Sequence, residues 1–141
     1  MKATILAGLL AVAIPAVSAA GEFESLADAR KFTDRTVELF RDEKIVEAFE
    51  SMKPYWPLPA AEIETVASQT SLQWPVVRQR FGPSVGTEFV KQLDGGPSFA
   101  RFIYLQKFQN HAIRWVFTFY KPKDRWVINA VSFDDQVNLL F

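Results

Sequence analysis

Hydrophobic and polar residues follow a helical period in the first half of the chain and a strand-like period in the second. In residues 25–41 apolar side chains recur every three or four positions, after a serine, Ser25, that is a suitable N-cap. The same spacing returns at residues 45–52 and again over residues 60–81. Three helices are therefore predicted, and the third either kinks at Pro75 or breaks and restarts there.

The segment between the second and third predicted helices, residues 53–59, contains three prolines. Proline removes a backbone donor and forces extended geometry on the residue before it, so no helix is expected here. Because Tyr55, Trp56 and Leu58 are apolar, we expect this loop to pack against the core.

Beyond Gly86 the period changes to that of strands. Strands are predicted at residues 87–93, 99–108, 112–120 and 126–133, and the last two form a hairpin around a polar turn. Their short connections favour an antiparallel meander. A block of helices followed by a block of strands predicts an α+β domain, with the three helices packed on one face of a four-stranded sheet.

The last hairpin predicts a sheet that is apolar on both faces. If Tyr120 lies opposite Trp126, one face carries Arg114, Val116, Thr118, Tyr120, Trp126, Ile128, Ala130 and Ser132. The other carries Ile113, Trp115, Phe117, Phe119, Val127, Asn129, Val131 and Phe133. Helices cover one face only, so a second copy, the curled sheet itself or a bound apolar ligand should cover the other. The residues expected at such an interface are Trp115, Phe117, Phe119 and Val131.

Residues 1–20 differ from the rest of the chain. A basic start, an apolar run and a small-residue end are typical of a secretory signal peptide, here cleaved after Ala19 or Ala20. A retained membrane anchor is disfavoured, because the run is shorter than the roughly 20 residues of a spanning helix and contains Pro15. We expect residues 21–141 to be one exported domain, periplasmic or secreted, without membrane insertion after cleavage.

Composition narrows the classes of partner. The chain has 141 residues, 49% of them hydrophobic, which is enough for one packed core. It contains no cysteine, so packing must hold the exported domain together without disulfides. Lys and Arg together number 16, as do Asp and Glu, and the basic residues are scattered. A nucleic-acid partner is therefore not expected.

Few residues indicate metal or acid–base chemistry. His111 is the only histidine and lies in a predicted turn without other metal ligands nearby, so neither a metal site nor a cofactor is expected. Asp134 and Asp135 follow the last strand. Adjacent strand residues point to opposite faces, so only one of the two can enter a given pocket, and an exposed acidic pair is the simpler interpretation.

Four residues are candidates for contact with a ligand: Tyr104, Tyr120, Arg114 and Trp74. The two tyrosines fall on the same predicted face of the sheet and carry hydroxyl groups. Arg114 lies among apolar residues, where a charge must find a partner or reach water. A ligand carboxylate, the rim of an interface or a plain salt bridge would each satisfy it. Trp74 lies on the third predicted helix.

The order of elements resembles the cystatin-like and NTF2-like α+β superfamily. The resemblance covers about residues 25–141 and rests on the final hairpin, where Phe119 and Tyr120, a charged turn at 121–125, Trp126 and Ile128 follow one another. It implies a strongly curved sheet, dimers through the sheet, and a small-molecule pocket between sheet and helices. Members include binding proteins, accessory domains, isomerases and dehydratases, so the resemblance selects no activity.

Three functional hypotheses follow. The first is a non-enzymatic exported domain that binds an apolar small ligand or a protein partner and self-associates through its sheet. The alternative is a small cofactor-independent enzyme of the isomerase or dehydratase type, with a tyrosine hydroxyl and Asp134, Asp94 or Glu88 as base. The third is a purely structural homodimer.

Overall fold

Three helices are followed by four strands, which confirms the predicted α+β fold. A computed structural model describes residues 21–141, and the expected leader at residues 1–20 lies outside the described residues. The helices are α1 (Leu26–Arg41), α2 (Ile45–Met52) and α3 (Ala60–Phe81), and the strands are β1 (Ser84–Gly95), β2 (Phe99–Phe108), β3 (Ala112–Tyr120) and β4 (Val127–Asp134). Two short 3-10 turns, η1 (Lys53–Tyr55) and η2 (Val137–Leu140), complete the described chain.

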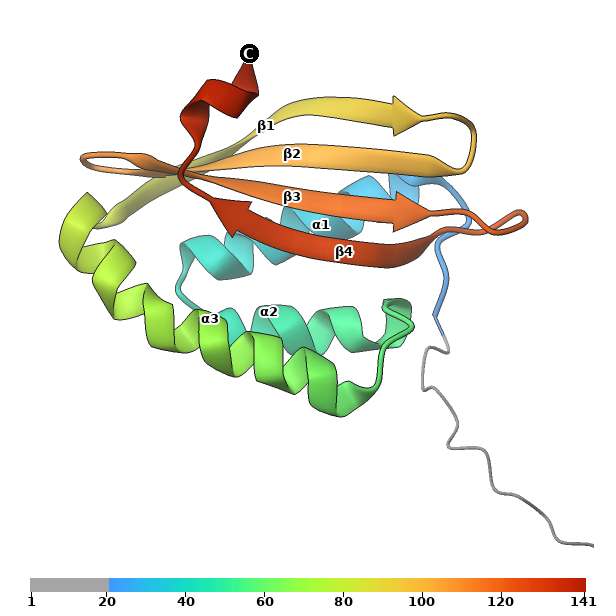
Figure 1. Cartoon of the computed structure of the whole chain (residues 1–141), viewed down its shortest axis with the longest axis horizontal. Coiled ribbons are helices and arrows are strands. Elements are labelled where there is room, and N and C mark those ends of the chain that lie inside the picture. The colour runs from blue at the N-terminus through green and yellow to red at the C-terminus, as the bar shows by residue number, and fades with distance from the viewer. Residues whose placement is uncertain (1–20) are drawn as a thin grey trace, which may run out of the picture.

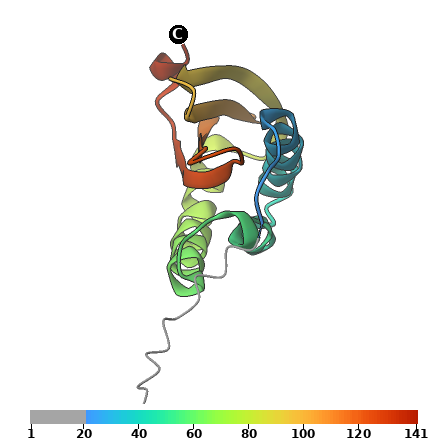
Figure 2. The same cartoon turned by 90° about the vertical axis from the view of Figure 1, so that its right-hand side faces the viewer.

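The four strands form one antiparallel sheet in the order β1-β2-β3-β4. The sheet is curved, and all three helices lie on its concave side (Figures 1 and 2). Strands β1 and β4 are the two edges. The short turn η2 lies on the opposite, convex side of the sheet. We call these two sides the concave and the convex face.

Local sequence explains the ends of the helices. The Ser25 side chain accepts a hydrogen bond from the Asp28 amide at 3.1 Å and so caps α1. Helix α3 continues through Pro75 without a break. It stops at Gly82, whose φ of 82° lies in the left-handed region that glycine adopts without strain.

The proline-rich loop corrects one prediction. Its first residues, Lys53–Tyr55, form the 3-10 turn η1, although no helix was expected there. Pro54 lies in the first turn, where the missing N–H would have no helical partner in any case. The remainder packs as expected, since the Trp56 side chain is buried.

The predicted pairing of the last hairpin is wrong by one residue. Tyr120 lies opposite Val127, not Trp126, and Trp126 instead pairs with Phe23 through an isolated bridge. A bulge follows, because Thr118 pairs with Ala130 and Phe119 with Ile128, which leaves Asn129 unopposed. The bulge shifts the register back, so that Val131 shares the concave face with Phe117 as predicted, whereas Trp126 and Ile128 were placed on the wrong face.

The concave face is the core of the protein, which makes the expected interface wrong for three of its four residues. Trp115, Phe117 and Phe119 are each 0% exposed within a single chain. The helices of the same chain cover them, so they cannot contact another molecule. The alternation of the strands identified an apolar face, but it could not say which of the two faces the helices would cover.

The convex face is partly covered by the C-terminal end of the described chain. Ile103 and Val116 pair across β2 and β3 on this face, and both are buried. Turn η2 contacts β3, and the Lys91 amine donates a hydrogen bond to the Leu140 carbonyl at 3.0 Å. The cover expected from a second copy, a curled sheet or a ligand is thus supplied here by the chain itself. Leu93 and Phe99 on the same face remain exposed.

Candidate functional site

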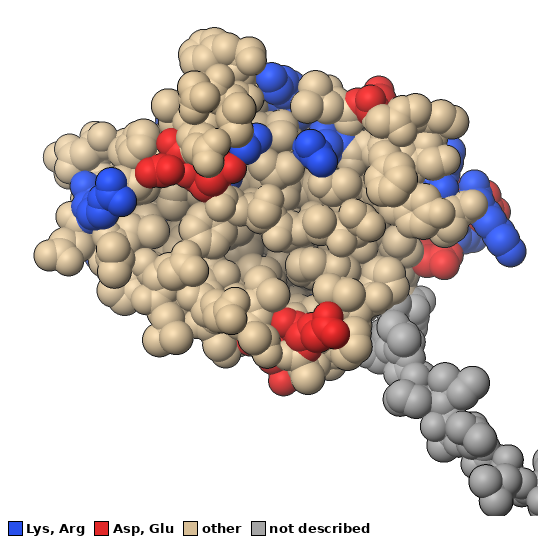
Figure 3. Space-filling view, in the orientation of Figure 1, with Lys and Arg blue, Asp and Glu red and all other residues tan. Residues whose placement is uncertain are grey.

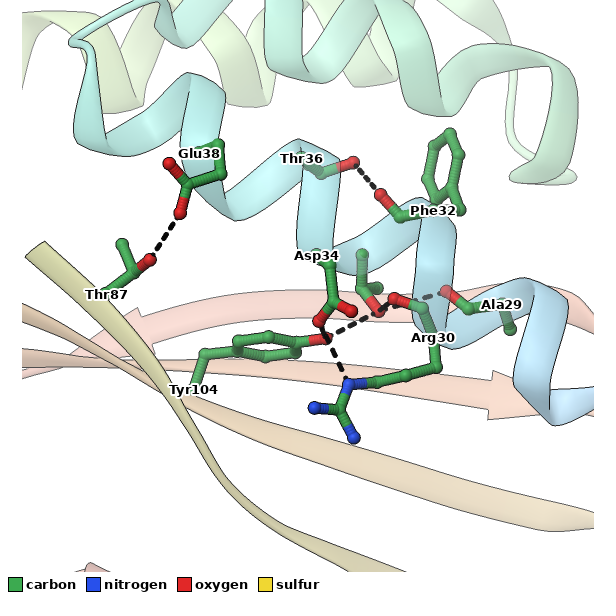
Figure 4. Close-up of polar contacts among 9 residues, drawn as sticks. Ala29, Arg30, Phe32, Asp34, Thr36, Glu38, Thr87 and Tyr104 are labelled. Atoms are coloured by element: carbon green, nitrogen blue, oxygen red, sulfur yellow. Dashed lines mark hydrogen bonds and ion pairs between the residues drawn. The ribbon is translucent and has the colours of Figure 1, made fainter.

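Tyr104 points from β2 toward α1 and meets a carboxylate there (Figure 4). Its hydroxyl donates to Asp34 Oδ1 at 2.5 Å and lies 3.0 Å from Thr33 Oγ1. Arg30 donates from Nε to the same Asp34 oxygen at 2.9 Å and places its guanidinium over the Phe89 ring, 3.2 Å from the ring centroid. A phenol, a carboxylate and a guanidinium are therefore joined in one network between α1 and the sheet.

This network holds the phenol in its protonated form. Burial, and then the hydrogen bond to Asp34, raises the pKa of Tyr104 well above its ordinary value. A phenol that gives up its proton so reluctantly serves as a hydrogen-bond donor and not as a base. None of the hollows described below is lined by Tyr104. The network joins α1 to β2 and has no described space for a substrate.

The raised pKa predicts a loss of stability at high pH that depends on Tyr104. The unfolded chain releases this proton near pH 10, as a free tyrosine does, and the folded chain retains it to higher pH. The free energy of unfolding should therefore fall as the pH rises above about 10, by at most about 1.4 kcal/mol per unit from this group. Urea unfolding at about pH 9 and 11 should show a smaller loss for Tyr104→Phe than for the wild-type chain. Equal losses in the two proteins would refute this role of the phenol.

The other expected sheet residues lie on the convex face. Tyr120 and Tyr104 were predicted on one face, but they point to opposite faces, and Tyr120 stacks on Phe99 with ring centroids 4.8 Å apart. Arg114 forms a bidentate salt bridge with Asp134, its neighbour across β3 and β4, at 3.1 and 2.7 Å. The charge of Arg114 is thus satisfied inside the chain. The described hollows are lined by none of these three expected ligand residues, Tyr104, Tyr120 and Arg114.

Trp74 lines the largest hollow described in residues 21–141, about 560 Å³ between the start of α2 and the middle of α3. Its rim carries Glu43, Lys44, Glu47 and Arg78. Glu43 and Arg78 satisfy each other in an ion pair at 2.8 Å. The hollow is wide and open, and its charges are of both signs, so it has little to favour one ligand over another.

A second site, the α3–β4 groove, runs between helix α3 and edge strand β4. It consists of two hollows of about 290 and 170 Å³, and Phe133 lines both. Val66, Val131 and Phe133, each partly buried, supply the apolar floor of the larger hollow, and the buried Phe49 and Trp115 lie beneath it. Three uncharged polar residues of α3, Gln69, Thr70 and Gln73, form its walls. Apolar floors with a few polar groups around them are typical of sites for small molecules.

The groove lies in a face without charge. Residues 65–77 of α3 and 126–133 along β4 contain no Lys, Arg, Asp or Glu. Figure 3 shows this face hollowed at its middle, with charged side chains along the rim. The charged groups nearest the groove line its smaller hollow, namely Arg80, Asp134 and Asp135. An apolar ligand would therefore meet neutral surface along most of the groove.

Two residues of the larger hollow, Trp115 and Val131, were singled out from the sequence, and both were assigned to an interface. Nothing in the sequence singled out Gln69 and Gln73 of α3 as ligand contacts, because exposed glutamines are common on helices. Gln106 did carry a signal, since it is a polar residue that shares its strand face with Ala100, Phe102, Tyr104 and Phe108. It is 0% exposed and accepts a hydrogen bond from Trp115 Nε1 at 3.0 Å, which fixes the indole beneath the groove. Asp34, the partner of Tyr104, lies on the exposed side of α1 and was not anticipated.

The described part of the chain contains no close group of three histidine, cysteine or acidic side chains arranged to hold a metal ion. Within residues 21–141, no helix combines the length and apolar character needed to cross a membrane. No family model matches this chain, and no curated protein or solved structure matches it significantly. The resemblance to the cystatin-like and NTF2-like superfamily therefore stays a prediction.

Proposed function

We propose that this protein is a non-catalytic binding domain that holds an apolar small molecule in the α3–β4 groove. The observation that carries the proposal is the composition of the groove, in which partly buried apolar side chains form the floor and neutral polar side chains of α3 form the walls. Covering such a floor with apolar ligand atoms is favourable by about 25 cal/mol per Å². The amide and hydroxyl groups on the walls would orient a ligand that carries one or two polar atoms.

The size of the groove limits the ligand. Its larger hollow, about 290 Å³, is at the lower end of the range of small-molecule sites. A molecule of about ten to twenty non-hydrogen atoms is a reasonable match to that volume. The signal-peptide pattern of residues 1–20 supports a place of action outside the cytoplasm, in a bacterial periplasm or beyond.

Binding is preferred to catalysis because the potential acid–base groups lie away from the larger hollow. The Tyr104 phenol contacts Asp34 under α1, and Asp134 is engaged by Arg114. A cofactor-independent isomerase or dehydratase needs an acid or base within hydrogen-bonding reach of its substrate. The larger hollow is lined by no ionisable side chain. The enzyme hypothesis would regain support if a substrate bound in the smaller hollow beside Asp135.

A charge placed in the groove should abolish most of the binding. We expect N-phenyl-1-naphthylamine, an uncharged probe that fluoresces in apolar surroundings, to bind residues 21–141. Val131→Glu should weaken this binding by about tenfold or more, because the new carboxylate must lose water when the probe covers it. Fluorescence titration of the purified domain measures the change.

The matched control is Ala130→Glu, a neighbouring substitution on the same strand that points to the convex face. It adds the same charge and should leave probe affinity unchanged. Equal weakening by the two variants, or no binding by the wild-type chain, would overturn the proposed groove. Whatever the probe shows, native mass spectrometry of the protein purified from its own cell envelope would identify a natural ligand that is retained.

A further inference from the structure

The side of α3 that borders the α3–β4 groove carries a row of residues at coiled-coil spacing. Steps of four and three residues alternate along the row, which is the spacing of side chains that face a partner helix. We call this row the α3 seam; it consists of Glu62, Val66, Gln69, Gln73, Val76 and Arg80. Five of these side chains are exposed, and that of Val66 is partly buried. Val76 is 57% exposed, and Leu72 beside the row is 79% exposed, so apolar surface remains uncovered on this part of α3.

The chemistry of the α3 seam is symmetric about its centre. Read from either end it gives a charged residue, a valine and a glutamine, except that the first charge is acidic and the last is basic. Glu62 and Arg80 are separated by roughly 18 residues, or about five helical turns and 27 Å, so they lie on the same side of α3. Neither belongs to an ion pair formed within residues 21–141. Their helix neighbours do, since Glu64 pairs with Lys53 and Arg78 with Glu43.

We propose that a second copy of this chain docks on α3 in an antiparallel orientation, about a two-fold axis at the level of Ser71. In that arrangement Glu62 meets the partner's Arg80, Val66 meets the partner's Val76, and Gln69 meets the partner's Gln73. Each contact occurs twice, as two-fold symmetry requires. A parallel pair would place Glu62 against the partner's Glu62 and Arg80 against the partner's Arg80, so the charges select the antiparallel orientation.

The surroundings of α3 fit this occupant. Leu72 flanks the α3 seam and is 79% exposed, and antiparallel docking directs the partner's Leu72 toward the α3–β4 groove beside Thr70. The absence of charge from residues 65–77 and 126–133 removes repulsion between the two copies. The aromatic residues of the sheet once expected at a dimer interface are unavailable, because Trp115, Phe117 and Phe119 are buried. A helix-centred interface is small, so we expect a dimer with a dissociation constant on the order of 10 µM.

Charge reversal tests the orientation as well as the interface. Sedimentation equilibrium of residues 21–141 should show a monomer–dimer equilibrium. Arg80→Glu and Glu62→Arg should each weaken it by at least about tenfold, because both symmetric contacts change from attraction to repulsion. The double variant, with Glu62→Arg and Arg80→Glu together, restores both contacts and should dimerise like the wild type. An equimolar mixture of the two single variants should form heterodimers, visible by native mass spectrometry, while each alone stays monomeric.

Exposed apolar residues provide the matched controls. Leu72→Glu should reduce dimerisation with little change in melting temperature, and Leu93→Glu, on the convex face, should leave it unchanged. A wild-type chain that remains monomeric at about 500 µM, or a dimer weakened by Leu93→Glu and not by Arg80→Glu, overturns the proposal.

Val66, Gln69, Gln73 and Arg80 of the α3 seam also line the groove, so dimerisation and probe binding compete for one surface. Probe binding is therefore measured on the Glu62→Arg variant, which should be monomeric and whose substituted residue does not line the groove. Probe binding by this variant without a wild-type dimer overturns only the dimer, and a wild-type dimer without probe binding by this variant overturns only the ligand site.

Discussion

Replacing Trp115 by alanine should lower the free energy of unfolding by about 3 to 5 kcal/mol. The indole is 0% exposed and stacks on Phe40, with ring centroids 3.8 Å apart and planes 12° from parallel. Removing it leaves a cavity at the centre of the concave face and deprives Gln106 of a hydrogen-bond donor. Domains of this size are typically stable by only about 5 to 15 kcal/mol, so this loss removes a large fraction of the total stability. Urea unfolding monitored by circular dichroism measures the loss.

The matched control for Trp115→Ala is Tyr120→Ala. This substitution also removes a large aromatic ring from β3, but on the convex face, where the side chain is only partly buried. It should cost less than about 2 kcal/mol. If the two substitutions cost the same, Trp115 does not occupy the centre of the core.

Replacing Gln106 by leucine should cost about 2 to 4 kcal/mol, although leucine is apolar and of similar size. The Gln106 amide accepts from Trp115 Nε1 at 3.0 Å, and its nitrogen donates to the Phe40 carbonyl at 3.3 Å and to Ser84 Oγ at 3.1 Å. Leucine would leave the indole N–H buried without an acceptor. Burial of an unpaired donor, more than the loss of a favourable contact, is the source of the expected destabilisation.

A double-mutant cycle tests this reason. Trp115→Phe removes the donor, so Gln106→Leu should cost distinctly less in a Trp115→Phe background than in the wild type. The surface control is Gln92→Leu, whose exposed amide contacts only Asp94 and whose loss should cost no more than about 0.5 kcal/mol. Additive costs of the two core substitutions would mean that the hydrogen bond between them is unimportant for stability.

The helices could be predicted well because local rules determine them. The spacing of apolar residues, the cap at Ser25 and the glycine at Gly82 act within one or two turns of chain. Pro75 left two outcomes open, because a proline disfavours the preceding turn without forbidding it. Packing of the flanking residues Trp74 and Phe81 against the sheet keeps α3 continuous.

The hairpin register was harder to predict for a physical reason. Alternation of side chains fixes a register only where one face differs clearly from the other, and the two faces of the last hairpin differ little in polarity along its sequence. The bulge at Asn129 lies three residues beyond Trp126, which bridges to Phe23, a contact between distant parts of the chain. No local pattern records such a contact.

For the candidate sites too, local features could be predicted from the sequence and contacts between distant residues could not. Tyr104 and Arg114 were rightly identified as polar groups that need partners, and each has a carboxylate partner in the chain. The identity of those partners, Asp34 and Asp134, follows from the packing of α1 on β2 and from the pairing of β3 with β4. The α3–β4 groove combines residues from distant positions whose types are individually unremarkable.

The sequence by itself determined the order of three helices and four strands, the α+β class, the zero net charge and the leader-like pattern of the first 20 residues. These depend on composition and on periods of two and 3.6 residues, which are local properties. Only the tertiary structure decided which apolar face became the core, how η2 came to cover part of the other face, and where neutral residues meet in a groove. Those outcomes depend on contacts between residues far apart in the chain, and on the volume that their side chains fill or leave open.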